Sequence, residues 1–335
     1  MSVDLSTEYL GLKLKNPVVI AACPLTESVD NLRRLEDAGA AAAVFPSLFE
    51  EQIEHEESEL ARVHEFTSDR HAEALNYFPE PEQYRFELDE YLDHIAAAKK
   101  AVSIPVIGSL NGVSDGGWIR YARLIEEAGA DALELNIYLI AADVDLPGDA
   151  VEKQYLDLVA AVKKSISIPL AVKVGPYFSS PANMAKRLVE SGADGLVLFN
   201  RFLQPGIDLD DLTVRTRLVF STPSELLLPL RWIARIHGRV PASLALTSGI
   251  HDADGMLQAL LAGADVGMIA SVLYQKGFGQ IGQILRGMAE WMEEKEYESV
   301  AQMKGSMSLE NCPDPSAFAR GNYMKTLTSF SGQPI

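Results

Sequence analysis

Four polar residues stand at the ends of short apolar segments, where their side chains could do chemistry. Lys173 lies inside the apolar stretch IPLAVKVGPYF, and Asn111, Asn136 and Asn200 each close a similar run. A buried ammonium is strongly disfavoured without a partner, so Lys173 requires one. Amides and an ammonium together offer donors and acceptors that suit a planar heterocycle with carbonyls and ring nitrogens. This set predicts a cradle for a cofactor, and the elements that carry it must bring it together.

The apolar segments belong to a repeated pattern. DAGAAAAVF at residues 37–45 recurs as EAGADALEL at 127–135, ESGADGLVL at 190–198 and LAGADVGMI at 261–269. In each copy a glycine suits the end of a helix, and an apolar strand follows directly. The repeat therefore indicates a series of helix-to-strand units.

A second phrase, isoleucine or valine followed by proline, precedes three of these copies in SIPVIGSLNG, SIPLAVKVG and RVPASLALTSG. Proline is tolerated at the first residue of a strand. Short apolar strands separated by amphipathic helices are typical of parallel strands buried on both faces. The predicted strands lie near residues 17–22, 41–46, 105–110, 132–137, 169–174, 195–200, 243–247 and 265–270. Eight such units predict an α/β fold, a (β/α)8 TIM barrel, with an open doubly wound sheet as the alternative.

Two segments exceed a minimal barrel. We expect residues 1–305 to form the barrel, with an insertion at 47–100 between the second and third strands that lies over the barrel mouth. Its acidic start, FEEQIEHEESEL, favours a helix, and LNYFPEPEQYRF favours a turn-rich segment. Residues 306–335 are expected to form a C-terminal extension packed on the barrel.

Composition excludes several classes of function. The net charge of −18 disfavours contact with nucleic-acid phosphates or anionic membranes. Cys23 and Cys312 have no metal-ligand spacing, so no metal, iron–sulfur or disulfide site is expected. The N-terminus has no signal-peptide pattern and no apolar run approaches membrane-spanning length, so we expect a cytoplasmic protein.

Small residues at the last two strand ends predict an anion site. Ser248 and Gly249 follow the seventh strand, and Ala270 and Ser271 follow the eighth. Active sites of such barrels form at the carboxyl ends of the strands, and phosphates bind after the last two. Small residues there let backbone N–H groups approach an anion. Ala22, at the end of the first strand, joins the same rim.

Several motifs in order along residues 5–305 resemble the dihydroorotate dehydrogenases of the soluble, class 1 type. They are NPVVIAA, ELN, AVKVGPYF, TSGI and GMIASVLYQKG. The resemblance implies an FMN-dependent oxidoreductase that acts on a CH–CH bond, as in the oxidation of dihydroorotate to orotate in pyrimidine biosynthesis. It also implies a small-molecule substrate and a possible homodimer.

The resemblance assigns roles to residues of this chain. It places Lys173 against N1 and the C2 carbonyl of the flavin, where a positive charge stabilises the reduced ring. The implied cofactor contacts are Ala22, Asn111, Asn136, Lys173, Asn200, Ser248, Gly249, Ala270 and Ser271. The implied substrate contacts are Asn76, Asn136, Asn200 and Arg201.

Departures from the family pattern fall on the chemistry. Leu139 occupies the place of the family's Cys or Ser base, and Ala141 replaces a substrate-binding asparagine. Pro46 stands where the family has a lysine, and Arg201 stands where a small hydroxyl residue is usual. Leucine cannot accept a proton, which leaves the catalytic base unknown and puts orotate chemistry in question.

Tyr138 and Cys23 are candidate substitute bases. A tyrosine is a poor base unless its pKa is perturbed, and Cys23 would become reactive if its thiol pKa were lowered. Core packing is the alternative role for both residues.

Three functions remain open from the sequence. The first is an FMN oxidoreductase with an altered small-molecule substrate and an unknown electron acceptor: fumarate, a quinone or a partner subunit. The second is a flavin-free phosphate-binding barrel, which would need an acid–base pair at the strand ends. The third is a catalytically degenerate paralogue that binds FMN or a partner protein.

Overall fold

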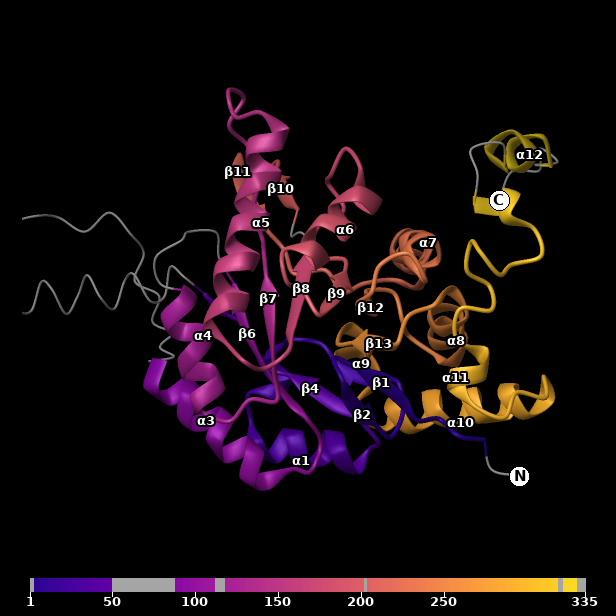
Figure 1. The fold of residues 1–335 in the computed structure, drawn as a ribbon, viewed down its shortest axis with the longest axis horizontal. Helices are drawn as coiled ribbons and strands as arrows, with labels where there is room; N and C mark the ends of the chain where they lie inside the picture. The colour runs from indigo at the N-terminus through magenta and orange to yellow at the C-terminus, as the bar shows by residue number, and fades with distance from the viewer. Residues whose placement is uncertain (1–2, 50–87, 112–117, 202–203, 319–321, 330–335) are drawn as a thin grey trace, which may run out of the picture.

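Eight parallel strands close into a barrel (Figure 1). A computed structural model describes residues 3–49, 88–111, 118–201, 204–318 and 322–329. The barrel strands are β3 (Val18–Ile20), β4 (Ala42–Val44), β6 (Val106–Asn111), β7 (Ala132–Asn136), β8 (Leu170–Val174), β9 (Gly195–Leu198), β12 (Ser243–Thr247) and β13 (Val266–Ile269). Pairing of β13 with β3 and of β4 with β6 closes the ring. The predicted TIM barrel is confirmed, and the open sheet is wrong.

Helices surround the strands, as the repeat predicted. They are α1 (Val29–Asp37), α3 (Leu88–Ala101), α4 (Trp118–Glu127), α5 (Gly148–Ser165), α6 (Pro181–Glu190), α7 (Leu227–Ile236), α8 (Ala253–Ala262) and α10 (Gly279–Glu294). Short helices are η1 (Pro24–Thr26), η2 (Pro223–Leu226), α9 (Ser271–Lys276), α11 (Val300–Met303), η3 (Pro315–Phe318) and α12 (Asn322–Ser329). Of the helices in the described ranges, none has the length and apolar character to cross a membrane.

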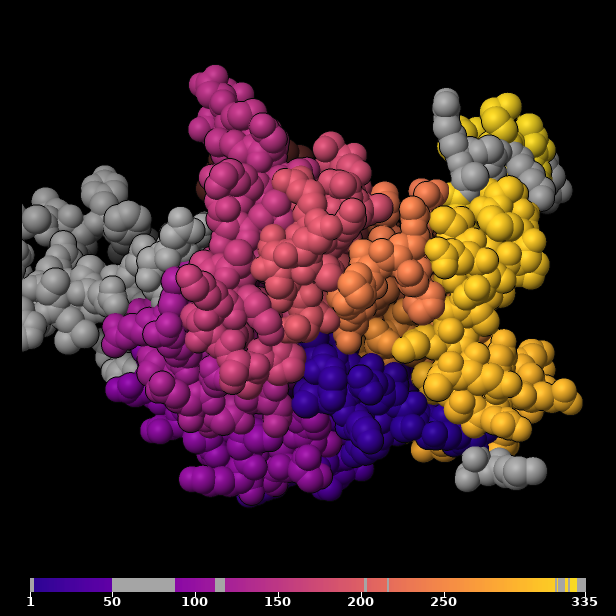
Figure 2. All heavy atoms as spheres, viewed as in Figure 1, coloured from indigo at the N-terminus to yellow at the C-terminus, as the bar shows by residue number. Residues whose placement is uncertain are grey.

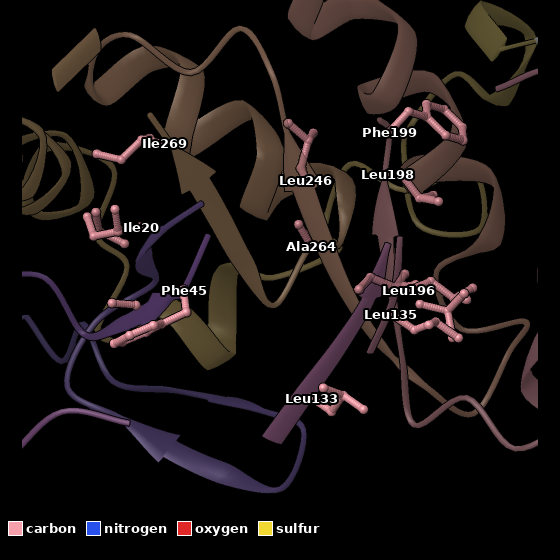
Figure 3. Close-up of a cluster of buried hydrophobic side chains, with 14 of the residues drawn as sticks. Ile20, Phe45, Leu133, Leu135, Leu196, Leu198, Phe199, Leu246, Ala264 and Ile269 are labelled. Atoms are coloured by element: carbon pink, nitrogen blue, oxygen red, sulfur yellow. The ribbon is translucent and has the colours of Figure 1, made fainter. Parts of the chain in front are cut away.

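The barrel has two cores because neighbouring strand residues face opposite sides. Residues such as Leu133, Leu135 and Leu196 point outward and pack under the helices (Figure 3). Alternate residues face inward and are mainly apolar, including Ala132, Ala171 and Ile107. The inward side chains leave little polar surface below the site, so most of the barrel interior is apolar.

A hairpin near the N-terminus covers one end of the barrel. It consists of β1 (Thr7–Tyr9) and β2 (Leu12–Leu14), which are antiparallel. Tyr9 belongs to the interior cluster and is 1% exposed. Figure 2 shows the indigo N-terminal residues between the magenta barrel units and the yellow C-terminal region.

The repeated AGAD phrases form one structural device at the amino ends of the strands. Asp194 accepts the backbone N–H of Leu170 at 2.7 Å and pairs with Lys163 at 2.6 Å. The same arrangement recurs twice, with Asp131 receiving Val106 N–H and Lys99, and Asp265 receiving Leu244 N–H and Lys304. The aspartate thus connects the start of one strand to the turn before the next.

The SIP phrases carry a matching contact. Ser103 donates its N–H to Glu36 at 2.9 Å, and Ser167 donates its N–H to Glu126 at 3.0 Å. Each serine hydroxyl also bonds the same carboxylate oxygen. The glutamates belong to helices α1 and α4, and the serines precede strands β6 and β8. Each contact therefore joins a helix to the start of a strand later in the chain.

The segments outside the minimal barrel are only partly described. Within the predicted insertion at 47–100, residues 50–87 lie outside the described residues, including both segments assigned a local structure from sequence. The described part contains β5 (Leu48–Phe49), which pairs with β6, and helix α3. Another hairpin, β10 (Pro205–Asp208) and β11 (Thr213–Thr216), follows β9.

The start of the 306–335 segment contacts two barrel helices. Met307 donates its N–H to Leu261 O in α8, and Leu309 donates its N–H to Ala234 O in α7. Arg235 of α7 bonds the carbonyl of Phe318. These contacts carry the chain along the outside of the barrel as far as η3.

Candidate functional site

Three of the predicted polar residues stand side by side at the carboxyl ends of neighbouring strands. Asn111 of β6 pairs in register with Asn136 of β7, which pairs with Lys173 of β8. Asn200, just beyond β9, donates from Nδ2 to Asn136 Oδ1 at 2.6 Å. The strand register and this hydrogen bond therefore bring four residues that are far apart in sequence into one continuous row.

Asn111, Asn136 and Lys173 are shielded from water, with exposures of 7%, 8% and 8%, and Asn200 is half-buried. Asn136 also donates to Ser47 Oγ at 3.4 Å, and Ser47 shares a 2.8 Å hydroxyl contact with Ser109. These serines support the asparagines from the β4 and β6 side. The result is a fixed surface of amide and ammonium groups.

Lys173 has a carboxylate partner that the sequence interpretation missed. Its ammonium lies 3.3 Å from Glu134 Oε1, and Glu134 is 0% exposed. Glu134 precedes Asn136 by two residues on β7, so strand alternation alone places both side chains on the inner face.

The row keeps donors that the described residues do not use. An ammonium has three N–H groups, and within the described ranges only the contact with Glu134 engages one. The other two N–H groups of Lys173 are largely shielded from water, since the residue is 8% exposed. An acceptor with partial or full negative charge, placed above the row, would satisfy them.

The predicted phosphate segments lie at the ends of β12 and β13. Ser248 and Gly249 both have positive φ, at 80° and 83°. A Cβ on Gly249 would lie 2.2 Å from the backbone nitrogen of Leu226 in η2. Glycine is therefore required for the close approach of η2 to this strand end, as well as for the backbone turn.

Ser271, which opens α9 after Ala270, contacts a segment that the sequence interpretation did not single out. Its hydroxyl accepts the Ser221 N–H at 3.1 Å, and the Ser221 hydroxyl contacts His251 Nε2 at 3.1 Å. Burial, followed by the charge of Lys276, lowers the pKa of His251 below 6.5. A neutral imidazole next to a serine is thus held beside the predicted phosphate position. The sequence signal for this contact was His251, the polar residue directly after TSGI.

Arg201, a predicted substrate contact, is hydrogen-bonded to residues 219–225. Its Nε donates to Glu225 Oε1 at 2.8 Å, and its other nitrogens bond the carbonyls of Val219 and Phe220. Although burial opposes the shift, hydrogen bonds from Arg201 and Thr222 give Glu225 a lowered pKa. The guanidinium is committed to the 219–225 segment, so the structure favours positioning of that segment by Arg201.

The departures at the family's base position are packed into the protein. Leu139 is half-buried against the outer core, and its backbone bonds the hydroxyl of Tyr155. Burial raises the pKa of the Cys23 thiol, which disfavours a reactive thiolate. Tyr138 is half-buried.

Two predicted contacts, Ala22 and Asn76, and one departure from the family pattern, Pro46, remain. Ala22 is half-buried at the end of β3, on the barrel rim. Pro46 accepts the Tyr91 hydroxyl at 3.0 Å through its carbonyl, so the position of the family's lysine is occupied by an internal contact. Asn76 lies outside the described residues.

The donor set fits FMN. The buried row offers amides and an ammonium with unused N–H groups, matching the carbonyls and ring nitrogens of an isoalloxazine. A turn with two consecutive positive φ angles lies across the mouth, at the strand ends where barrels bind phosphate. A residue with a side chain at Gly249 would disturb this turn.

The chain is similar to several curated proteins over most of its length. It is 26% identical over 310 residues to "Dihydroorotate dehydrogenase B (NAD(+)), catalytic subunit" of Thermoplasma acidophilum, covering 90% of this chain and 98% of that protein. A protein of the same name from Methanothermobacter thermautotrophicus is 26% identical over 308 residues, covering 90% and 97%. "NAD-dependent dihydropyrimidine dehydrogenase subunit PreA" of Escherichia coli K12 is 22% identical over 328 residues, covering 91% and 77%. No family profile matches the chain.

Proposed function

We propose that this chain, a divergent dihydroorotate dehydrogenase-like oxidoreductase, binds FMN and acts on a CH–CH bond of a small pyrimidine-like molecule. The observation that carries the proposal is the buried row of Asn111, Asn136 and Lys173 in register on three neighbouring strands. The relatives are named for dihydroorotate and dihydropyrimidine dehydrogenation, which supports the same class of substrate here.

The residues of the row would hold the flavin, and the turn at Ser248 and Gly249 would hold its phosphate. When bound, FMN would supply the hydride chemistry of the reaction. Lys173 would place a positive charge next to the part of the ring that gains electron density. Asn136 and Asn200 hydrogen-bond each other, so their orientations are coupled before any ligand arrives.

The substrate is proposed to differ from dihydroorotate. Oxidation of any dihydropyrimidine, dihydroorotate included, releases a proton as well as a hydride. Because Leu139 has no group to accept that proton, it would pass to another group or to solvent. Dihydroorotate differs from the simpler compounds in its carboxylate, which needs a cation to bind it. The inward side of the site holds no charged group besides Glu134 and Lys173 among the described residues at the row, and Arg201 is bound to Glu225. A substrate without a carboxylate, such as a simple dihydropyrimidine, fits this surface better.

A catalytically degenerate paralogue is the second candidate. The observation that favours it is the packing of Leu139 against the outer core, together with the buried, raised-pKa thiol of Cys23. Such a protein would bind FMN, or a partner protein, without turnover.

A separate partner is the proposed source or destination of electrons. The relatives carry the words "catalytic subunit" or "subunit" in their names, along with NAD. We propose that this chain likewise exchanges electrons with a second polypeptide. The proposal agrees with the absence of a candidate metal cluster among the described residues.

The first test is an absorption spectrum of the purified protein and of Lys173→Ala. We expect flavin bands near roughly 370 and 450 nm, with release of free FMN on denaturation. Lys173→Ala should bind FMN at least about tenfold more weakly, because it removes the charge below the ring and leaves Glu134 buried without its partner. Lys186→Ala, in an exposed pair on α6, is the matched control and should retain FMN. A colourless protein that also fails to bind added FMN would refute the proposal.

Turnover separates the two candidates. Dihydroorotate and dihydrouracil would be supplied with an acceptor dye, and flavin bleaching would be followed without the dye. Bleaching by dihydrouracil but not dihydroorotate would support the altered-substrate enzyme. An FMN-loaded protein that reacts with neither compound, nor reduces uracil when its flavin is reduced, would favour the degenerate paralogue.

A further inference from the structure

We propose that Glu134 is a positioning and charge-balancing residue for Lys173, so that the pair sets the preference of the protein for reduced over oxidised FMN. The lysine alone would favour the reduced cofactor more strongly. The inference rests on the proposed function for the identity of the cofactor. The pairing itself can be tested without any cofactor.

The geometry makes the two residues each other's charge partner. Lys173 Nζ lies 3.3 Å from Glu134 Oε1, with side-chain exposures of 10% and 0%. Lys173 is in register with Asn136, one inward-facing position above Glu134 on the neighbouring strand. The carboxylate therefore lies below the amide–ammonium row, on the side away from the proposed flavin.

Little else in the described interior can neutralise Glu134. Its second oxygen, Oε2, is buried and has no hydrogen-bond partner among the described residues. The residues in register with it are Ser109 and Ala171, neither of them charged. Below lies Tyr9, whose pKa is raised first by burial and then by the charges of Glu134 and Asp265. A buried carboxylate in such surroundings depends on its single cation.

The sign of the effect follows from charge. Two electrons and one proton convert oxidised FMN into the anionic reduced form, which adds one negative charge to the ring. The ammonium of Lys173 stabilises this added charge, and the carboxylate of Glu134 opposes it from a greater distance. Removing the carboxylate should therefore favour reduced FMN, and removing the ammonium should favour oxidised FMN.

The cofactor test uses Glu134→Gln, which keeps the shape and an acceptor for Lys173 but removes the charge. Midpoint potentials would be measured by dithionite titration against a reference dye, and converted to the ratio of affinities for reduced and oxidised FMN. We expect this ratio to rise about tenfold in Glu134→Gln and to fall at least as much in Lys173→Met. Glu190→Gln, in an exposed pair on α6, should leave it unchanged.

The second test measures apo stability, so it also covers variants that do not load FMN. Glu134→Gln and Lys173→Met should each lower the melting temperature because each leaves one buried charge. The double variant should melt higher than Lys173→Met, which shows coupling between the residues. The ratio of affinities for reduced and oxidised FMN should also be higher in the double variant than in Lys173→Met.

The outcomes distinguish this inference from the proposed function. An FMN-loaded wild type in which Glu134→Gln leaves the ratio unchanged would overturn the inference and leave the proposed function standing. Strictly additive melting-temperature changes would overturn the pairing. A wild type that never binds FMN would refute the proposed function and the flavin part of the inference together, whatever the apo coupling.

Discussion

The two ends of the barrel use charge in opposite ways. At the amino ends of the strands, each of Asp131, Asp194 and Asp265 is satisfied by a strand N–H and a lysine. At the carboxyl ends, amides form a row beside a lysine with unused donors. The aspartates at the amino ends are satisfied by partners within the protein, and these contacts fix the fold. The row at the carboxyl ends leaves hydrogen-bonding capacity for a ligand, which is why the binding function is assigned to that end.

The ends also differ in repetition. The amino-end contacts recur because each βα unit must solve the same problem, the start of a strand after a helix. The carboxyl ends show no such shared contact: Asn111 and Asn136 close β6 and β7, Lys173 lies near the end of β8, and Thr247 closes β12. Repetition therefore marks stability in this molecule, and its absence marks the site.

Gly249→Ala should have the largest effect at the carboxyl end. The added Cβ would lie 2.2 Å from Leu226 N at a φ of 83°, so η2 must shift and the backbone is strained. We expect a loss of about 2–5 kcal/mol in the free energy of unfolding and weaker FMN binding. Urea unfolding and FMN titration measure both.

Gly11→Ala, in the turn between β1 and β2, is the matched control, because Gly11 has a φ of 74° with nothing within 4 Å of an added Cβ. It should lose only about 1 kcal/mol, from backbone strain. Equal losses in the two variants would show that the contact with Leu226 is unimportant.

Asp194→Ala should affect the amino end and leave the site alone. It leaves the Leu170 N–H and the Lys163 ammonium without their acceptor. We expect the free energy of unfolding to fall by about 1–3 kcal/mol, with unchanged FMN affinity. Asp157→Ala, in an exposed pair with Lys153, should change stability by less than about 0.5 kcal/mol. A specific loss of FMN affinity in Asp194→Ala would contradict the division between the two ends.

Arg201→Gln tests whether this residue positions a segment or binds substrate. Loss of its contacts with Glu225 and two carbonyls should lower the free energy of unfolding by about 1 kcal/mol and weaken FMN binding a few-fold. If a substrate is identified, its KM should change no more than the FMN affinity does. Arg215→Gln, on the exposed β11, is the control. A large rise in KM at full FMN loading would restore the substrate-binding role.

Ser167→Ala should have the smallest effect, and it depends on pH. The Ser167 hydroxyl is the largest cause of the lowered pKa of Glu126, whose ordinary value is 4.5. Because the folded pKa lies below the unfolded one, the contact stabilises the protein above pH 4.5 and is lost as pH falls through the folded value. The variant should therefore be less stable than wild type at pH 7, and the difference should shrink as the pH falls below 4.5. A difference that persists at low pH would show that the charge is not responsible.

The fold was predictable because its determinants are local and repeated. Glycine at a helix end, proline at a strand start and a short apolar run specify each unit without reference to distant residues. The polar row was predictable for the same reason: Asn111 and Asn136 close their strands, and Lys173 is the residue before the last one of β8. Their register follows once the strands are known to be parallel neighbours.

The side-chain pairings were harder to predict. Glu134 could have been found, because a glutamate two residues before Asn136 shares its face of the strand. The contact of Arg201 with Glu225 joins positions 24 residues apart through an irregular segment, and no period in the sequence indicates it. The thiol of Cys23 required knowledge of its burial, since burial is the main cause of its raised pKa.

The N-terminal hairpin has a consequence for the order of events during synthesis. Leu10 N–H bonds the Ser243 hydroxyl, 233 positions later in the chain, and Thr7 bonds the carbonyl of Asp265. The ribosome therefore releases the hairpin long before its acceptors exist. The hairpin can therefore dock only after residues 243–265 have been synthesised, and until then the barrel end that it covers is open to water.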